Sequence, residues 1–352
     1  MFDCKNTLNM QAAEACRCHW DSIAKPLGSL GLLEDDIAKI AGILETDDVR
    51  LEKKGVLAFC ADNGVVEEGV SQSGQDVTAI VARNMAAGIA NVNAMARAVG
   101  ADVFAVDVGV AMDVSDAPGL VHKKVMPGTR NMTKGPAMTR EEACRAIQAG
   151  IDLVGEMKQK GYKILATGEM GIGNTTTSSA LVSVLLDKPI AEVTGRGAGL
   201  SDAGLMRKHA AIARAIEVNK PDPADALDVL HKIGGLDIAA IAGAFIGGAV
   251  HRIPIVVDGF ISSAAALVAM RLCPNAKNFM LASHVSGEPA GRMVMDALGL
   301  EVPVHARLAL GEGTGAVTLF PLLEMALAVY HQNSTFEKIN LAAYTRFEED
   351  AK

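Results

Sequence analysis

Short apolar runs alternate with longer amphipathic stretches along most of the chain. The run Gly55–Cys60 contains no charged or hydroxyl side chain, which is typical of a strand buried on both faces of a sheet. Strands separated by helical stretches indicate right-handed crossovers and a parallel sheet. The further predicted strands are Asp102–Val108, Lys163–Thr167, Ile253–Val257, Asn278–Leu281 and Ala306–Leu308.

Helical periodicity appears at both ends of the chain as well as between the strands. The segments 7–24 and 29–46 are predicted helices, separated by a proline and a glycine that stop the first of them. The other predicted helices are Val77–Val99, Arg140–Lys158, Leu236–Val250, Val317–Asn333 and one in which the helical pattern resumes at Thr177.

This order of elements predicts an α/β protein with a doubly wound, mostly parallel, Rossmann-like sheet. The last helix, Val317–Asn333, is expected to pack against the two N-terminal helices. We therefore predict a small helical domain made of residues 1–48 and 320–352, beside a large α/β domain of residues 49–319.

Composition narrows the range of partners. The chain has 352 residues, 35 of them glycine, and a net charge of −8 with no block of basic residues. Nucleic acids and anionic membranes are bound through clustered positive charge, so neither is an expected partner. The longest apolar run, Leu236–Val250, is shorter than the roughly 18 to 20 residues of a membrane span. We expect it to form a buried helix.

The cysteines and the N-terminus favour a cytoplasmic protein. Residues Met1–Trp20 are polar and do not resemble a signal peptide. The six cysteines, at positions 4, 16, 18, 60, 144 and 273, are scattered, and we expect them to be reduced thiols. No His, Cys or Asp cluster has metal-ligand spacing, so no metal site is predicted.

The first candidate binding motif runs from Gly168 to Thr176, between a predicted strand and a predicted helix. Glycines let the backbone approach a phosphate at a helix N-terminus, although a tight turn alone is the alternative. The motif is not a Walker A loop, and Thr176 replaces the third glycine of a dinucleotide fingerprint. The candidate phosphate-binding residues are Gly171, Ile172, Gly173, Asn174, Thr175 and Thr176.

Further candidates follow other predicted strands or glycine-rich turns. Arg196 lies within Gly195–Gly197, a flexible turn suited to an anion, and Lys208 is a second candidate cation. A solvated loop that caps the next helix is the alternative for this turn. Ser286 has a hydroxyl that can donate to a phosphate, and Asp258 is suited to bind ribose hydroxyls or to cap a helix.

Glu312 occupies an unusual position for a carboxylate. It follows an apolar run and is flanked by Gly311 and Gly313, so no bulky neighbour in sequence keeps it from a ligand. Partial burial would raise its pKa into the range of a general base. The alternative is a solvated glutamate in a turn.

Taken together, these segments resemble the nicotinate-nucleotide–dimethylbenzimidazole phosphoribosyltransferase family, in the same order and over nearly the whole chain. The resemblance implies a doubly wound domain, a small helical domain from both termini, and a homodimer. The matching motifs are Lys25–Gly31, Ala61–Val65, Gly128–Asn131, Gly168–Thr176, Gly195–Asp202, Gly234–Asp237, Val257–Gly259, Ser283–Glu288 and Gly311–Gly315.

The resemblance also implies a reaction in cobamide biosynthesis. A 5-phosphoribosyl group would pass from nicotinate mononucleotide to an aromatic acceptor, giving an α-riboside phosphate and nicotinate. Glu312 would be the general base and Glu169 a second acidic group near the reacting carbon. The pyridinium ring leaves with a neutral nitrogen, so no metal or cofactor is expected. The phosphate and ribose would be held by Gly171–Thr176, Gly195–Gly197, Lys208, Asp258 and Ser286.

One stretch departs from the family pattern. After Gly-Val-Ser the family commonly has Ala-Tyr-Pro, and a Gln shortly beyond Val-Thr, whereas this chain has Gln72-Ser73-Gly74 and Ile80. Loss of an aromatic platform favours a different acceptor, such as phenol, p-cresol or a purine, although retained dimethylbenzimidazole is the alternative. The chain could also pair with a related subunit as a heterodimer. The predicted acceptor-pocket residues are Ser71, Gln72, Ser73, Ile80, Leu310 and Gly311.

Two other functions are compatible with the predicted fold. A dinucleotide-dependent oxidoreductase predicts a glycine at 176, where this chain has threonine, and an acidic residue about 20 positions later, for which Asp187 and Glu192 are available. A non-catalytic nucleotide-binding module is the second alternative. It would tolerate Glu312→Gln, whereas the transferase would not.

Overall fold

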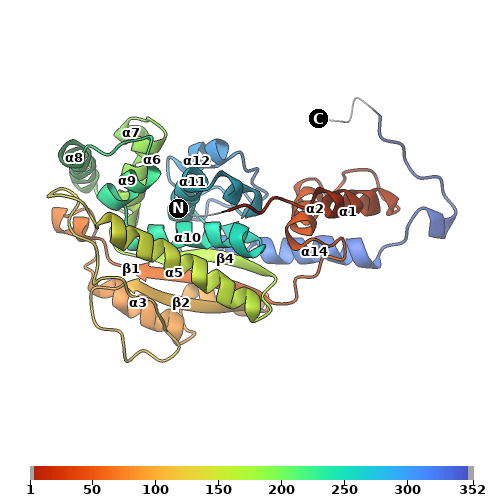
Figure 1. Cartoon of the computed structure of the whole chain (residues 1–352), viewed down its shortest axis with the longest axis horizontal. Helices are drawn as coiled ribbons and strands as arrows, with labels where there is room; N and C mark the ends of the chain where they lie inside the picture. Colours follow the sequence, from red (N-terminus) through yellow and green to blue (C-terminus); the bar gives the residue numbers. More distant parts are fainter. Residues whose placement is uncertain (1–3, 348–352) are drawn as a thin grey trace.

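A parallel sheet forms the centre of the protein, in a computed structural model that describes residues 4–347 (Figure 1). Its six strands have the order β3-β2-β1-β4-β5-β6, so β1 and β4 are neighbours although β2 and β3 lie between them in sequence. The predicted α/β class with a parallel, doubly wound sheet is confirmed. The strands are β1 Lys54–Ala61, β2 Ala101–Gly109, β3 Val121–His122, β4 Ile164–Met170, β5 Ile255–Val257 and β6 Met280–Ala282.

The predicted strand Ala306–Leu308 is wrong. This segment is exposed or half-buried, and Arg307 has a left-handed φ of 54°, which interrupts an extended backbone. Instead, His284, just after β6, forms an isolated parallel bridge with Val304. The two-residue strand β3 was not predicted, because it is too short to show an apolar pattern.

The predicted helix Val77–Val99 is two helices, α3 and α4. Gly88, with a φ of 79°, lies in the turn between them, where a right-handed helix cannot continue. The predicted helix Val317–Asn333 corresponds to α14, which is separated from the short helix α13 by the single residue Thr318. The helices are α1 Met10–Ser22, α2 Leu32–Leu44, α3 Asp76–Ala86, α4 Asn91–Ala98, α5 Arg140–Gln159, α6 Asn174–Leu185, α7 Ile190–Val193, α8 Asp202–Asn219, α9 Ala226–Ile233, α10 Leu236–His251, α11 Phe260–Leu272, α12 Gly291–Leu298, α13 Thr314–Val317 and α14 Leu319–Gln332, with 3-10 turns η1 Gly64–Glu68, η2 Pro274–Phe279 and η3 Glu337–Ile339.

Each face of the sheet is covered by its own hydrophobic core. Side chains of β1 alternate between the two: Leu57 and Phe59 belong to a core with α5, α10 and α11, while Val56 and Ala58 face a core that includes α2 and α14. Every residue of β1 is buried, as the continuous apolar run predicted.

The terminal helices α1, α2 and α14 lie together at one end of the molecule, opposite α8 and α9 (Figure 1). Their core residues, such as Trp20, Ile37 and Leu323, belong to the same hydrophobic cluster as one face of the sheet. The division into residues 1–48 plus 320–352 and residues 49–319 stays a prediction.

Two apolar helical segments are parts of the protein interior. The run Leu236–Val250 forms α10, which is almost completely buried, as predicted. Among the described residues, one helical stretch, Thr314–Gln332, is long and apolar enough to cross a membrane by length and composition, and 56% of its apolar window is buried inside the protein. That burial is the behaviour of a core helix.

Cys4 and Cys273 form a disulfide across a sequence separation of 269 residues, so the prediction of six reduced thiols is wrong for this pair. The N-terminal segment reaches η2 and α10 through polar contacts as well, since Asn275 Nδ2 donates to the Cys4 carbonyl over 2.9 Å and Asn6 Nδ2 to the Ala249 carbonyl over 2.9 Å. Cys16, Cys18, Cys60 and Cys144 are free thiols.

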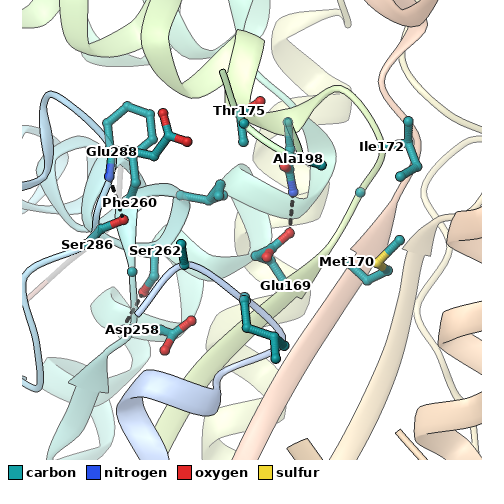
Figure 2. A pocket seen from close by; sticks show the side chains of 18 of the residues that line it. Glu169, Met170, Ile172, Thr175, Ala198, Asp258, Phe260, Ser262, Ser286 and Glu288 are labelled. Carbon is teal, nitrogen blue, oxygen red and sulfur yellow. Dashed lines mark hydrogen bonds between the residues drawn. The ribbon is translucent and has the colours of Figure 1, made fainter. Parts of the chain in front are cut away.

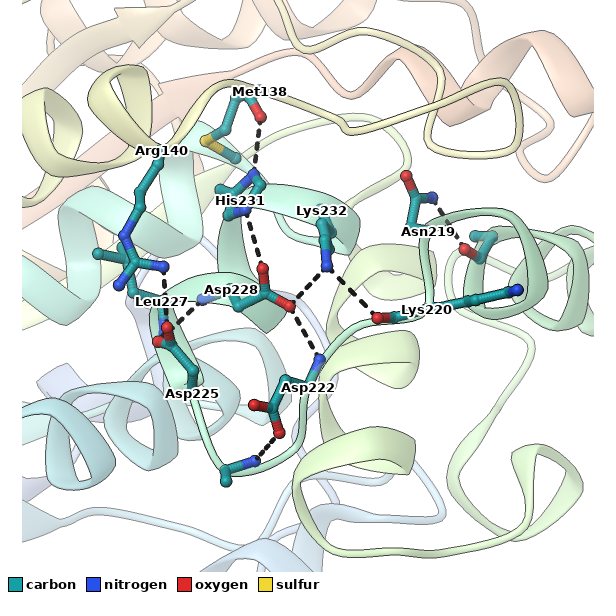
Figure 3. Close-up of polar contacts among 12 residues, drawn as sticks. Met138, Arg140, Asn219, Lys220, Asp222, Asp225, Leu227, Asp228, His231 and Lys232 are labelled. Carbon is teal, nitrogen blue, oxygen red and sulfur yellow. Dashed lines mark hydrogen bonds and ion pairs between the residues drawn. The ribbon is translucent and has the colours of Figure 1, made fainter.

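A polar network fixes the start of α9 to α5 (Figure 3). Asp225 accepts hydrogen bonds from the Leu227 and Asp228 amides and pairs with Arg140 over 2.8 Å. Asp228 in turn pairs with Lys232 over 2.7 Å. These residues lie outside the pocket described below, and we regard the network as structural.

The contact between α5 and α10 depends on two glycines. A Cβ on Gly150 would lie 2.0 Å from the Ala240 carbonyl oxygen, and a Cβ on Gly243 would lie 2.0 Å from the Ile147 carbonyl oxygen. Such distances place backbone against backbone and leave nothing flexible to move aside.

Gly150→Ala is therefore expected to lower the free energy of unfolding by about 2–3 kcal/mol, measured by urea denaturation. Gly135→Ala is the matched control, because a Cβ there meets nothing within 4 Å. Equal stability of the two variants would contradict this description of the contact.

Candidate functional site

A pocket of about 260 Å³ opens beyond the carboxyl ends of β4, β5 and β6. This is the place where an open parallel sheet binds ligands. Figure 2 shows Glu169 and Asp258 projecting toward this pocket from the ends of β4 and β5. Its walls are residues 70–72, 169–175, 196–198, 200, 258–262, 284, 286, 288, 308–311, 314 and 315.

The predicted phosphate motif forms one wall. β4 ends at Met170, α6 begins at Asn174, and Gly173 between them has a φ of 95°, which favours glycine. A Cβ on Gly171 would lie 2.4 Å from the Ala61 carbonyl oxygen, so this position accepts no side chain. The motif therefore brings the N-terminus of α6, the positive end of its dipole, to the pocket.

Lys208 lies directly behind this wall. It is completely buried, and its Nζ donates to Thr175 Oγ1 over 2.8 Å and to the Gly195 carbonyl over 3.1 Å. Burial lowers the pKa of Lys208 to about 8, and Glu288 partly opposes this effect. Lys208 thus joins the α6 motif to the Gly195–Gly197 turn, two segments that the sequence suggested separately.

Glu169 is the carboxylate at the centre of the site. It is 8% exposed, and its Oε2 accepts a short hydrogen bond from Asn174 Nδ2. Burial raises the pKa of Glu169 to about 7 against the effect of the Asn174 amide, and the carboxylates of Asp237 and Asp258 raise it further. A group with this pKa is poised to take or release a proton near neutral pH.

The side chain of Glu312 points away from the pocket, contrary to expectation. Its Oε1 accepts from Asn91 Nδ2 and its Oε2 from the Val92 amide, each over 3.0 Å, so the carboxylate caps α4. The physical reason is that the N-cap residue of α4, Ala90, has no side-chain acceptor of its own. Only the Glu312 backbone faces the site, where its amide is directed at the Glu169 carboxylate.

Asp258 and His284 form a buried pair on another wall. Asp258 Oδ1 accepts from the Ala316 amide over 2.8 Å, and burial raises the pKa of Asp258 although His284 opposes this. Ser283 Oγ lies 3.0 Å from His284 Nδ1. Ser286 also lines the pocket, and its Oγ accepts from the Glu288 amide over 3.3 Å.

Several predicted residues are near the pocket without lining it. Gly195 packs against Glu288, and Thr176 is buried in the first turn of α6. Arg196 does line the pocket, but its guanidinium is engaged by the Leu200 carbonyl and by Asp202 within its own loop.

The predicted acceptor residues are only partly brought together. Ser71, Gln72, Leu310 and Gly311 line the pocket, whereas Ser73 and Ile80 do not. Ile80 is 52% exposed, because α3 buries the face formed by Thr78, Ala79, Ala82 and Met85. A role for Ser73 or Ile80 at the acceptor stays a prediction.

Sequence reasoning assigned no role to two acidic residues at the site. Glu288 lines the pocket and has a buried Oε2 without a hydrogen-bond partner among residues 4–347. Asp237 lies behind Asn174 and is fully buried. The only signal for either was its place in a glycine-containing motif, Ser283–Glu288 or Gly234–Asp237.

Comparison with known proteins places this pocket in a family. A family model described as a phosphoribosyltransferase matches residues 6–340. The nicotinate-nucleotide–dimethylbenzimidazole phosphoribosyltransferase of Acetivibrio thermocellus is 51% identical over 324 residues, covering 92% of each chain. The chain belongs to the nicotinate-nucleotide–dimethylbenzimidazole phosphoribosyltransferase family.

Other members of the family agree over almost their full lengths. The enzyme of the same name from Ruminiclostridium cellulolyticum is 45% identical over 341 residues, 97% of each chain. The crystal structure of CobT from Thermus thermophilus superposes with a TM-score of 0.89 at 40% identity, covering 94% of this chain and 99% of that one. These relatives give no support to a dinucleotide-dependent oxidoreductase or a non-catalytic module.

The site also contains no recognisable metal centre within residues 4–347, since no group of three or more His, Cys, Asp or Glu side chains there is arranged to hold an ion. The polar side chains that line the pocket are hydroxyls, carboxylates, the amides of Gln72 and Asn174, Arg196 and His284, and Lys208 lies behind Thr175.

Proposed function

We propose that this protein transfers the 5-phosphoribosyl group of nicotinate mononucleotide to an aromatic acceptor, giving an α-riboside phosphate and nicotinate during cobamide biosynthesis. Family membership supports the reaction type. The observation that carries the proposal for this chain is one pocket that joins the α6 phosphate motif to the buried carboxylate of Glu169.

In this proposal the phosphate binds at the N-terminus of α6. Gly171–Thr176 and Gly195–Gly197 bring backbone groups close to it, and Lys208 supplies the positive charge from below. Ser286 contributes a hydroxyl, and Asp258 lies where a ribose hydroxyl can donate to it. The fixed phosphate holds the reacting carbon, C1′, in one place.

The transfer then needs a proton acceptor rather than a metal. A lone pair of the acceptor forms the new bond to C1′, while the electrons of the C1′–N bond move to the pyridinium nitrogen and neutralise it. Attack opposite the leaving ring inverts C1′ from β to α. The acceptor releases a proton, which passes to a carboxylate. A glutamate whose pKa is raised can take up this proton near neutral pH.

Two glutamates are candidates for this step, and different observations favour them. The family resemblance favours Glu312 as the base, with Glu169 stabilising positive charge on the sugar. Glu312 must then turn its side chain from α4 into the pocket and give up its hydrogen bonds to Asn91 and to the Val92 amide. Glu169 already faces the pocket and needs no such movement.

The acceptor would bind beside the pocket wall formed by residues 71, 72 and 310. Ser71, Gln72 and Leu310 give the pocket a wall without an aromatic ring, and Gln72 is held by the Gly199 carbonyl. A phenol, p-cresol or purine acceptor and retained dimethylbenzimidazole are both compatible with this wall. We further propose a cytoplasmic enzyme that acts as a homodimer, or as a heterodimer with a related subunit.

Incubation with nicotinate mononucleotide and each acceptor in turn tests the proposal. We expect acceptor-dependent release of nicotinate, detected by chromatography, with no added metal. Competition among dimethylbenzimidazole, phenol, p-cresol and adenine then identifies the acceptor, and a clear preference for dimethylbenzimidazole would exclude an altered one. Absence of nicotinate release with every acceptor would refute the proposed function.

A further inference from the structure

Asp237 is a fully buried carboxylate that no described cation neutralises. It lies in the first turn of α10 with 0% exposure, and no ion pair to it is present among residues 4–347. Its Oδ2 accepts from Asn174 Nδ2 over 3.0 Å, and its Oδ1 has no hydrogen-bond partner within the same residues. The Asn174 side chain and the Ile238 and Asp237 amides favour the charged carboxylate, but burial outweighs them and raises the pKa of Asp237 to about 6.

Two glycines hold the Asp237 carboxylate in its place. A Cβ on Gly171 would lie 2.6 Å from Oδ2, and a Cβ on Gly235 would lie 2.4 Å from Oδ1. The first of these glycines belongs to the phosphate motif itself. The backbone of that motif therefore passes directly over Asp237, which lies behind the pocket wall.

Asn174 connects this carboxylate to the site. Its Nδ2 donates to Asp237 and also to Glu169, and an amide nitrogen has only two hydrogens to donate. Both hydrogens are thus engaged between two carboxylates, which fixes the plane of the amide. Without Asp237, nothing on that side would hold the second hydrogen, and the amide could rotate away from Glu169.

We propose that Asp237 is a positioning residue of the transfer reaction: it orients the Asn174 amide, which holds the carboxylate of Glu169 at the pocket. This inference rests on the proposed function, because it assigns Glu169 a part in the chemistry. Asp237 itself touches no ligand, since it is not part of the pocket wall.

The titratable groups nearest this unit are carboxyls and one thiol, since the buried Cys60 of β1 faces both Glu169 and Asp237. Asp62, at the end of β1, faces Asp237, and Asp258, at the end of β5, faces Glu169. Asp237 and Asp258 each raise the pKa of Glu169. Removal of Asp237 therefore has two opposed effects on the pKa of Glu169: loss of its charge lowers the pKa, while release of the Asn174 amide raises it, and the hydrogen bond is the larger of the two causes.

The test is Asp237→Asn, compared with Asp62→Asn. The control aspartate is also fully buried and also has an oxygen without a partner in residues 4–347, but its other oxygen binds the Ala111 amide and not Asn174. For Asp237→Asn we expect kcat to fall by about 10- to 100-fold with a nearly unchanged KM for nicotinate mononucleotide. The acid limb of its kcat–pH profile should shift to higher pH, because the lost Asn174 hydrogen bond outweighs the lost charge. Removal of the charge alone would shift that limb to lower pH, and a purely structural role would leave it in place.

A double-mutant cycle makes the link to Glu169 specific. In a Glu169→Gln background, Asp237→Asn should lower kcat no further, because the group that it positions is gone. Asn174→Ala tests the same link if Asp237→Asn fails to fold, and it should lower kcat in the same way. A folded Asp237→Asn enzyme with wild-type kcat and an unmoved pH profile would overturn the inference while leaving the proposed function intact. A wild-type enzyme that releases no nicotinate would overturn both.

Discussion

Glu312→Gln is expected to lower kcat by about 10²- to 10⁴-fold while nicotinate mononucleotide still binds. The substitution removes the proton acceptor that the family resemblance assigns, but it leaves the backbone amide directed at Glu169. It also weakens the cap on α4, because the Glu312 carboxylate accepts hydrogen bonds from Asn91 Nδ2 and from the Val92 amide. The loss of stability should be about 1 kcal/mol. Steady-state kinetics and nucleotide titration measure the two effects on function.

Asn91→Ala separates the cap from the chemistry. It removes one of the two hydrogen bonds to the Glu312 carboxylate and leaves the glutamate in place. We expect a loss of stability similar to that of Glu312→Gln, with far smaller loss of kcat. If Glu312→Gln lost stability and kept its wild-type turnover, Glu312 would be a helix cap only, and Glu169 would remain as the base.

Glu169→Gln is expected to lower kcat strongly and to stabilise the ligand-free protein at pH 8. The pKa of Glu169 rises from 4.5 to about 7 on folding, so the folded state binds a proton more tightly than the unfolded state does. The contribution of this group to stability is therefore highest below pH 4.5 and falls as the pH rises through 7. At pH 8 the charged carboxylate costs about 3 kcal/mol, which glutamine avoids.

Urea denaturation at two pH values checks this sign. The variant should unfold at higher urea than the wild type at pH 8, and the difference should vanish below pH 4.5, where the carboxyl group is mostly protonated in both the folded and the unfolded state. An equal or larger difference at the lower pH would show that the gain comes from packing and not from the charge. A gain in stability with a loss of turnover is the usual signature of a strained functional group.

The central strands could be predicted because each is an unbroken apolar run, as in Gly55–Cys60. The glycine-containing turn between β4 and α6 could be predicted because its glycines follow such a run directly. Phosphate binding by this turn stays a prediction. The exposure of Ile80 was within reach of the same reasoning, since the buried positions 78, 79, 82 and 85 of α3 leave position 80 on the opposite face.

Other features depend on neighbours that are distant in sequence. The Glu312 side chain turns to α4 because Ala90 leaves that helix without a cap, and this pairing spans 220 residues. Asp237 accepts a hydrogen bond from Asn174, which lies 63 positions away in the sequence. The Cys4–Cys273 disulfide likewise joins two parts of the chain whose local sequences do not reveal the contact. The local sequence around each residue contains no information about such long-range contacts, so only the folded structure shows them.

The order of the strands has a consequence for how the enzyme matures. Neighbouring strands β1 and β4 pair from Lys54 with Ile164, so this contact forms only after roughly 100 residues of intervening chain have been made. Such non-local pairing slows folding. The pocket further needs residues 308–315, near the end of the chain. A nascent polypeptide therefore has no complete pocket until residue 315 has left the ribosome.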